Sequence, residues 1–227
     1  MIDIEEVAEK IYRLGVQVPE IDRVFAVYLI NEEKAALIEP GPAAVVPYIQ
    51  EGMKQLGMEE LAYIIPTHIH LDHGGGTGQL AVLFPQATVV LHPHGMKHAI
   101  DPSRLIQSTR TAFGDDFEVH WGPILPVPES QVKAPLDGET ISLDSRELQC
   151  IYAPGHASHH MAVLDRKTGG LFSGEALGIP RSGAEDFPVP YATPGFDMEA
   201  YLETIERLKQ LKPSMLFYSH GGVGERT

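Results

Sequence analysis

The chain is built from short apolar runs typical of buried strands, separated by turn residues or by segments of helical periodicity. These runs occupy residues 24–30, 35–39, 61–65, 87–91, 140–143, 147–152, 161–165, 170–173 and 215–218. Four polar residues, 31–34, join the first two runs and predict an antiparallel hairpin. Residues 165–169 predict a tight turn between two of the later runs, and the second half is again expected to be rich in hairpins.

Apolar residues three and four positions apart predict helices between these strands. One helix begins near Val46 and is capped by Gly57, another is stopped by Pro85, and a third covers residues 103–113. Asp197 caps a fourth. The apolar face expected for the fourth helix consists of Met198, Tyr201, Leu202, Ile205, Leu208 and Leu211. Strands and helices therefore alternate in both halves, as in an α/β protein.

Two proline-rich stretches are expected to be irregular. Residues 121–135 have the composition of a connection over the surface. Residues 181–195 hold Phe187 and Tyr191 among prolines and glycines. A loop of this length often covers a site. A plain surface connection and a dimer contact are the alternatives.

The composition limits the class of protein. The length favours one domain spanning residues 1–227, and the formal charge of -14 disfavours binding to nucleic acid or to an anionic membrane surface. The amino terminus lacks a secretory signal, and no apolar run approaches the ~20 residues of a membrane span. The single cysteine, Cys150, cannot form an internal disulfide and is expected in the core. These features predict a cytoplasmic protein that acts on a small molecule, with a homodimer left open.

The candidate chemistry begins directly behind the run 61–65. His68, His70, Asp72 and His73 lie within six consecutive residues. Imidazole and carboxylate hold zinc, iron or manganese in open catalytic sites, whereas structural zinc sites rely on cysteine thiolates. The spacing therefore predicts a catalytic metal site.

Three further ligand-type residues follow later strand-like runs. These are His156, Glu175 and His220. Catalytic groups concentrate in loops along one edge of an open sheet, because rigid strands position those loops. We expect the three residues to meet the first cluster in space.

Residues 68–73 have the motif H-x-H-x-D-H, which is followed in order by a His after a Pro-Gly turn, an acidic residue and a final His. In these motifs the chain resembles the metallo-β-lactamase superfamily over nearly its whole length. The resemblance implies a four-layer αβ/βα sandwich of two mixed β-sheets flanked by helices. It also implies two divalent metal ions, Zn²⁺ foremost, with Fe or Mn as alternatives. The implied ligands are His68, His70 and His156 for the first ion, Asp72, His73 and His220 for the second, and Glu175 as a bridge.

Two residues depart from the pattern of that family. Glu175 stands where the family usually has the Asp of a Gly-Asp pair, and Glu39 stands where an Asp near the site is typical. Glutamate carries the same charge on a stem one methylene longer, so it can still ligate while the spacing, occupancy or identity of the metals changes. We hypothesise that the two changes are a shared adjustment of the pocket.

The mechanism implied by the resemblance is hydrolysis by a metal-activated water. Two cations ~3.5–4 Å apart lower the pKa of a shared water and polarise the substrate. Asp72 is the expected catalytic residue, orienting the water and accepting its proton. A thioester or ester is the expected substrate, as in glyoxalase-II-like relatives. The alternatives are a lactonase of the same fold and a metal-binding or ligand-sensing protein with little turnover.

The remaining histidines are weaker candidates for a role in the metal site. His92, His94 and His98 are expected in a solvated loop and helix start, with a pocket or supporting role for His98 as the alternative. His160 occupies a position that is often His in glyoxalase-like relatives and is expected to support the ligands. Residues 74–76, three consecutive glycines, lack the Lys-Ser/Thr ending of a phosphate loop and are expected to pack tightly against the following helix.

Overall fold

Two β-sheets form the centre of the structure, a computed structural model that describes residues 2–18, 21, 24–180 and 188–224. The first sheet has seven strands in the order β1-β2-β3-β4-β5-β6-β7. Their bounds are β1 Ile2–Ala8, β2 Ile11–Gln17, β3 Val24–Ile30, β4 Ala36–Ile38, β5 Tyr63–Ile65, β6 Thr88–Val90 and β7 Val132–Lys133. Strands β1 to β4 pair antiparallel and β4 to β7 pair parallel, so the sheet is mixed.

The second sheet has six strands in the order β13-β12-β11-β10-β9-β8. Their bounds are β8 Thr140–Ser142, β9 Glu147–Tyr152, β10 Met161–Asp165, β11 Gly170–Gly174, β12 Met215–Tyr218 and β13 Val223–Gly224. In the described residues of this sheet, β11 and β12 pair parallel and all other neighbouring strands pair antiparallel. The hairpins expected in the second half are therefore present.

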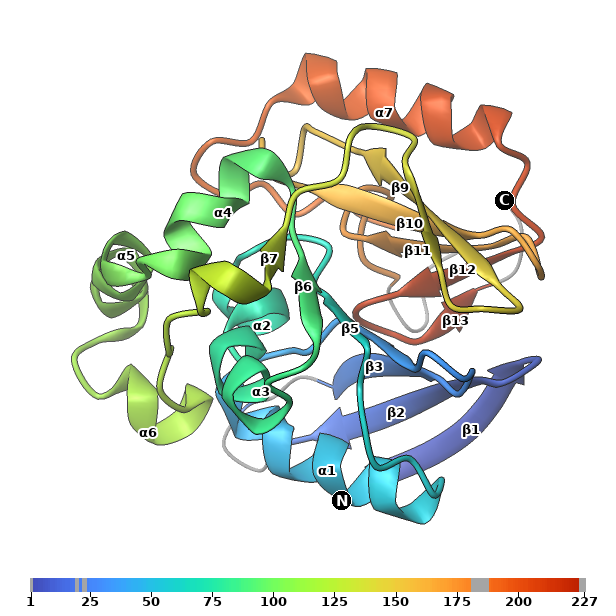
Figure 1. Cartoon of the computed structure of the whole chain (residues 1–227). Helices are drawn as coiled ribbons and strands as arrows, with labels where there is room; N and C mark the ends of the chain where they lie inside the picture. The colour runs from blue at the N-terminus through green and yellow to red at the C-terminus, as the bar shows by residue number, and fades with distance from the viewer. Residues whose placement is uncertain (1, 19–20, 22–23, 181–187, 225–227) are drawn as a thin grey trace.

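Helices cover the outer faces of both sheets (Figure 1). Their bounds are α1 Val46–Gln55, α2 Leu71–Gly74, α3 Thr77–Leu83, α4 Pro93–Ile100, α5 Ser103–Phe113, α6 Phe117–Trp121 and α7 Met198–Gln210, with 3-10 turns η1 Ala43–Val45 and η2 Glu129–Gln131. Helices α1 and α3 pack on the first sheet and α7 packs on the second. The four-layer αβ/βα sandwich is thus confirmed.

Strand β3 shows why a continuous apolar run is needed in such a sandwich. Phe25, Val27 and Leu29 belong to the cluster beneath α1 and α3, whereas Tyr28 and Ile30 belong to the cluster between the sheets. Successive side chains of a strand point to opposite faces, so a strand buried on both faces must be apolar throughout.

The structure corrects three details predicted from the sequence. Met198 and Leu202 of α7 are each 55% exposed, and Thr204 is buried in their place because its hydroxyl donates to the Pro154 carbonyl at 2.6 Å. The irregular stretch 121–135 contributes β7 to the first sheet. His92 is buried rather than solvated, with its ring 4.2 Å from that of Tyr152 and its Nδ1 accepting from the backbone of His94.

Strands β1 and β2 are an addition to the predicted order. They form an antiparallel hairpin that extends the first sheet beyond β3. Within the described residues, no helix has the length and apolar character needed to cross a bilayer.

Candidate metal centre

The ligand-type residues are brought together at one edge of the two sheets. Glu39 follows β4, residues 67–73 follow β5, Glu175 follows β11 and His220 follows β12. Because β4 pairs parallel with β5, and β11 with β12, the carboxyl ends of each pair lie at the same edge. A bond between the sheets, from the Met161 amide to the Thr67 carbonyl at 2.7 Å, holds the two edges against each other.

The seven predicted ligands fall into two adjoining clusters. In each cluster the candidate ligand atoms all lie within 4.8 Å of one another. The clusters are His68, His70, His156 and Glu175, and Asp72, His73 and His220. The six residues other than Glu175 are grouped as the family resemblance implies, whereas Glu175, which the resemblance implies as a bridge, falls within the first group.

Glu175 lies between the clusters. Its Oε2 is 2.7 Å from His156 Nε2 and 3.8 Å from His68 Nε2 in the first cluster, and 3.7 Å from His73 Nε2 in the second. Asp72 Oδ2 is 3.6 Å from His73 Nε2 and 3.5 Å from His220 Nε2. The glutamate therefore reaches both clusters despite standing where the family usually has aspartate.

Hydrogen bonds outside the clusters orient the rings. His73 Nδ1 lies 2.5 Å from Glu39 Oε2, and His68 Nδ1 lies 3.0 Å from the Thr67 hydroxyl. His156 Nδ1 lies 3.1 Å from the Tyr191 carbonyl oxygen. Each of these contacts leaves Nε2 aimed into the cluster, the arrangement by which outer partners fix the tautomer of a metal ligand.

Several atoms aimed into the centre have no hydrogen-bond partner among the described residues. They are the Nε2 atoms of His68, His73 and His220 and the Oε1 atom of Glu175, all buried. Leaving a buried polar atom unpaired costs about 1–3 kcal/mol. Four such atoms converging from different loops fit divalent metal ions, which would satisfy them with nitrogen and oxygen ligands.

The electrostatics of the centre favour the forms of the side chains that bind metal. Burial lowers the pKa of His68 well below its ordinary value and that of His70 to about 4, so both rings stay neutral. Burial opposes ionisation of Glu175, but the His156 hydrogen bond and the nearby His73 bring its pKa below the ordinary value. Neutral imidazoles and ionised carboxylates are the species that ligate.

His73 is the exception in the absence of metal. Burial disfavours its charged form, but Asp72 and Glu39 outweigh this effect and raise its pKa to about 9. The carboxylates around the second cluster therefore stabilise a positive charge at this position.

His160 has the supporting position expected for it. Its Nε2 accepts a hydrogen bond of 3.1 Å from the Glu175 amide, and its ring stacks on His68 with centroids 4.8 Å apart. A Cβ added to Gly174 would come within 2.5 Å of His160 Nε2. Glycine at this position therefore allows the close approach that orients the Glu175 backbone.

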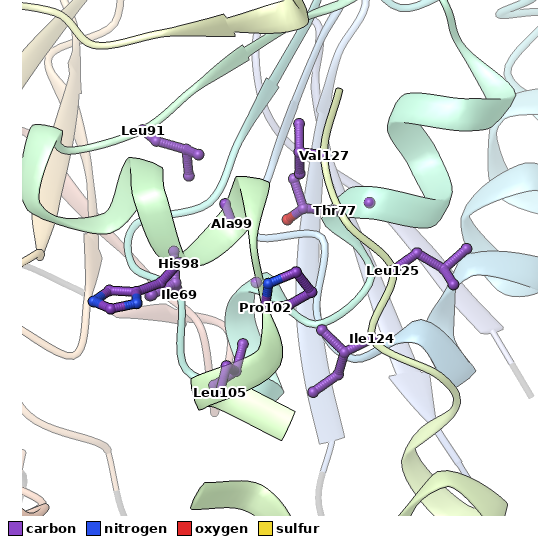
Figure 2. A pocket seen from close by; sticks show the side chains of 12 residues that line it. Ile69, Thr77, Leu91, His98, Ala99, Pro102, Leu105, Ile124, Leu125 and Val127 are labelled. Atoms are coloured by element: carbon purple, nitrogen blue, oxygen red, sulfur yellow. The ribbon is translucent and has the colours of Figure 1, made fainter. Parts of the chain in front are cut away.

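The histidines of α4 lie outside the centre. His98 lines a cavity of about 10 Å³ together with Ile69, Pro102 and Val127 among others (Figure 2). Thr77 also lines it, with a buried hydroxyl that has no partner among the described residues. A space of this size holds about one water molecule. The cavity lies in the packing behind the ligand loop and is too small for a substrate.

The glycines of residues 74–76 pack the ligand loop closely, as expected. A Cβ on Gly75 would lie 2.4 Å from the Leu71 carbonyl oxygen, and one on Gly74 would lie 2.9 Å from the Ile69 Cα.

Cys150 is fully buried in the core between the sheets, also as expected.

A larger cavity of about 520 Å³ opens beside the candidate metal centre. His70, Asp72 and Glu175 form part of its lining, so the centre is accessible from it. The other described lining residues are Ile21, Leu71, Leu105, Ser108, Thr109, Ala112, Phe113, Trp121, Tyr191, Ala192, Thr193 and Pro194. Reasoning from the sequence identified the helix 103–113 but not its part in a pocket, although Leu105, Thr109 and Ala112 recur at helical spacing.

Part of the loop 181–195 does cover this cavity. Tyr191 to Pro194 line it, and the Thr193 hydroxyl donates to the His156 carbonyl at 3.2 Å. Phe187, which was singled out in the same loop, lies outside the described residues.

Comparison with known proteins agrees with this geometry. The family profile described as the metallo-beta-lactamase superfamily matches residues 8–220. The chain belongs to the metallo-β-lactamase superfamily. A metallo-beta-lactamase fold-containing protein, ST1585 of Sulfurisphaera tokodaii, is 28% identical over 211 residues, covering 92% of this chain and 76% of that protein. Its crystal structure matches with a TM-score of 0.80 over 96% of this chain and 82% of that one, at 25% identity.

The relatives of this superfamily member whose names state an activity include a thioesterase and a hydrolase. An atrochrysone carboxyl ACP thioesterase of Aspergillus fumigatus is 24% identical over 171 residues, which is 73% of this chain and 40% of that protein. A hydroxyacylglutathione hydrolase of a Synechococcus species is 28% identical over 161 residues, which is 71% of this chain and 52% of that protein. The family, the fold and the cluster of ligand-type residues make this chain a metal-dependent hydrolase.

Proposed function

We propose that this protein hydrolyses a thioester or ester with a water activated at a dinuclear metal centre. The observation that carries the proposal is the convergence of seven ligand-type side chains, in two clusters joined by Glu175, beside a substrate-sized cavity. The names of the two relatives above favour hydrolysis of an acyl group from a sulfur leaving group.

One metal ion would be held by His68, His70 and His156. The second would be held by Asp72, His73 and His220, with Glu175 between the two ions. Zn²⁺ is the ion we expect foremost, with Fe or Mn as alternatives. Bound divalent ions lower the pKa of a coordinated water and polarise the acyl oxygen of the substrate.

Asp72 is the residue we assign to proton transfer. Its side chain is 20% exposed and lines the cavity, whereas that of Glu175 is only 4% exposed. Asp72 is therefore the carboxylate that both a water and a substrate can reach, with Oδ2 held near His73 and His220. It orients the attacking water and takes its proton.

The reaction conserves its atoms in a simple way. The water oxygen forms a bond to the acyl carbon, the bond from that carbon to sulfur or oxygen breaks, and the leaving group takes up the proton held by Asp72. The products are a carboxylic acid and a thiol or alcohol.

The test combines metal analysis with turnover. Protein loaded with Zn, Mn or Fe is assayed on panels of thioesters, lactones and phosphodiesters, alongside His68→Ala and Asp72→Ala. We expect thioester or ester turnover that needs metal and falls by at least about 10²-fold in Asp72→Ala. Full metal occupancy without hydrolysis would instead favour a ligand sensor, and a preference for lactones would favour a lactonase.

A further inference from the structure

Apart from the candidate ligands, the described residues that line the cavity beside the candidate metal centre are uncharged and largely apolar. Asp72 and Glu175 are the only acidic or basic residues of the described lining other than His70, and both belong to the ligand clusters. The other polar groups are neutral, and they include the hydroxyls of Ser108 and Thr109. A substrate group that carried a carboxylate or phosphate into this space would meet no described cation.

One face of α5 forms a wall of the cavity. Leu105, Thr109 and Ala112 line it at spacings of four and three residues, which places them on the same side of a helix. Arg110 is not part of the lining, and its Nε instead lies 3.4 Å from Asp115. Arg104, the other basic residue of α5, is also not part of the described lining, so both basic residues of the helix lie outside this wall.

A series of aromatic rings extends from His220 of the candidate metal centre to Trp121 and Phe113 in the lining of the cavity. The centroid of Phe25 lies 5.9 Å from that of His220 and 6.2 Å from that of Trp121, and Trp121 lies 5.2 Å from Phe113. Phe25 is buried, whereas Phe113 is 55% exposed and Tyr191 is 53% exposed. Phe113 and Tyr191 both line the cavity, and large, partly exposed apolar side chains in the lining of a pocket are typical of a ligand-binding groove.

We propose that this groove binds the acyl part of the substrate as an extended, uncharged apolar chain or ring of medium size. The inference rests on the proposed hydrolase function and adds its substrate class. The acyl carbon lies at the floor near Asp72, the apolar tail runs along α5 and Trp121, and the leaving group points away from the groove. A volume of about 520 Å³ is within the range that holds ligands of drug size, far larger than an acetyl group.

The first test measures how turnover depends on chain length. Metal-loaded protein is assayed on acetyl, butyryl, hexanoyl, octanoyl and decanoyl thioesters of N-acetylcysteamine, whose thiol is uncharged. Because each buried methylene contributes roughly a fourfold gain, kcat/KM should rise on the order of 10²-fold from butyryl to octanoyl. A flat or falling profile overturns the inference.

A matched pair of variants locates the effect. Ala112→Phe fills the groove and should lower the octanoyl-to-butyryl ratio of kcat/KM at least about tenfold. Thr111→Phe adds the same ring at the neighbouring, exposed residue that is not part of the lining, and should leave the ratio unchanged. Equal ratios in both variants contradict the assignment.

A binding measurement makes the inference independent of turnover. Trp121 is the only tryptophan of the chain, so its fluorescence reports on this groove. Octanamide should shift the emission of the metal-loaded protein saturably, whereas acetamide and the carboxylate-ended suberamate should shift it at least about tenfold more weakly. Octanamide binding with no turnover of any thioester or ester supports the groove and overturns the proposed function. Turnover without a chain-length effect or octanamide binding overturns the groove alone.

Discussion

Glu39 and His73 form a buried hydrogen bond of 2.5 Å between Oε2 and Nδ1, although 34 positions separate them in the chain. The other carboxylate oxygen of Glu39 accepts from the Thr67 amide at 2.9 Å. Burial opposes ionisation of Glu39, but His73 and these hydrogen bonds hold its pKa below the ordinary value. The residue also adopts a left-handed backbone with φ of 61°, a conformation that is costly for a side chain larger than glycine. Glu39 therefore links the end of β4 to the orientation of a candidate ligand on α2.

Replacing Glu39 by Gln should weaken metal binding at the second cluster. The substitution keeps the size of the side chain but removes the charge that orients and polarises His73. Loss of such an outer partner typically costs 10–100-fold in metal affinity. Competition with a chelating dye measures this loss. Glu33→Gln, an exposed neighbour of the hairpin, is the control and should bind as the wild type does. Equal affinities in the two variants would show that Glu39 does not support His73.

Shortening Glu175 to Asp should change the metal content. Removing one methylene withdraws the carboxylate by roughly 1.5 Å, and Oε2 already lies 3.7–3.8 Å from His73 and His68. The variant should retain less than the full complement of metal on elemental analysis and should lose activity in parallel. Glu147→Asp, an exposed change in the same sheet, controls for the substitution itself. Identical stoichiometry and activity in Glu175→Asp would remove the basis for a shared adjustment with Glu39.

Removing metal should lower thermal stability. The Nε2 atoms of His68, His73 and His220 are buried without partners among the described residues, so they need a ligand or water when metal is absent. Metal at a thousand times its Kd adds about 4 kcal/mol to the folded state, which for a chain of this size is roughly 8–16 °C in Tm. Thermal scans with and without a chelator measure the difference. His68→Ala should show a clearly smaller shift, and a wild-type Tm that does not respond to chelator would argue against a resident metal.

Stability should fall in acid through a network on the far side of the sheets. Glu32 accepts from Lys10 at 2.9 Å, Ser145 at 3.0 Å and Arg146 at 3.3 Å, and buried Arg146 also donates to Asp165 of the second sheet at 2.5 Å. Burial opposes ionisation of Glu32, but its three donors bring the pKa down to about 2.

The sign of the pH effect follows from this depressed pKa. The ionised carboxylate stabilises the folded state fully above its ordinary pKa of 4.5, and this contribution is lost as pH falls through about 2. Glu32→Gln should lower the free energy of unfolding at pH 7 by on the order of 1–3 kcal/mol. The gap to wild type should close between pH 4.5 and 2 in urea titrations, while Glu33→Gln shows no gap. A gap that is constant with pH would exclude Glu32 as the titrating group.

Local sequence patterns were sufficient to predict most elements and to single out the candidate ligands that the fold brings together. The helix 103–113 and the strands 147–152, 161–165 and 215–218 have the bounds predicted from periodicity and turn residues. Periodicity predicts these elements because burial of one or both faces of a helix or strand fixes which positions along it are apolar. Ligand types were recognisable because few side chains can hold a divalent ion, and they recur after strands.

Other features depended on contacts between distant parts of the chain. Thr204 is buried in α7 because a carbonyl 50 residues away accepts its hydroxyl, which no helical pattern records. Glu39 was noticed as a departure from the family pattern, but its link to His73 became evident only when β4 was placed beside β5.

By itself, the sequence determined most of the elements, the burial of the central strands and the identity of the candidate ligands. The tertiary structure alone decided which ring nitrogens face the centre, how far Glu175 reaches, and that α5, Trp121 and residues 191–194 line a groove whose described residues, apart from the candidate ligands, are uncharged. The physical reason is that periodicity records only whether a side chain is buried. The neighbour against which it is buried depends on how the two sheets and their covering helices pack.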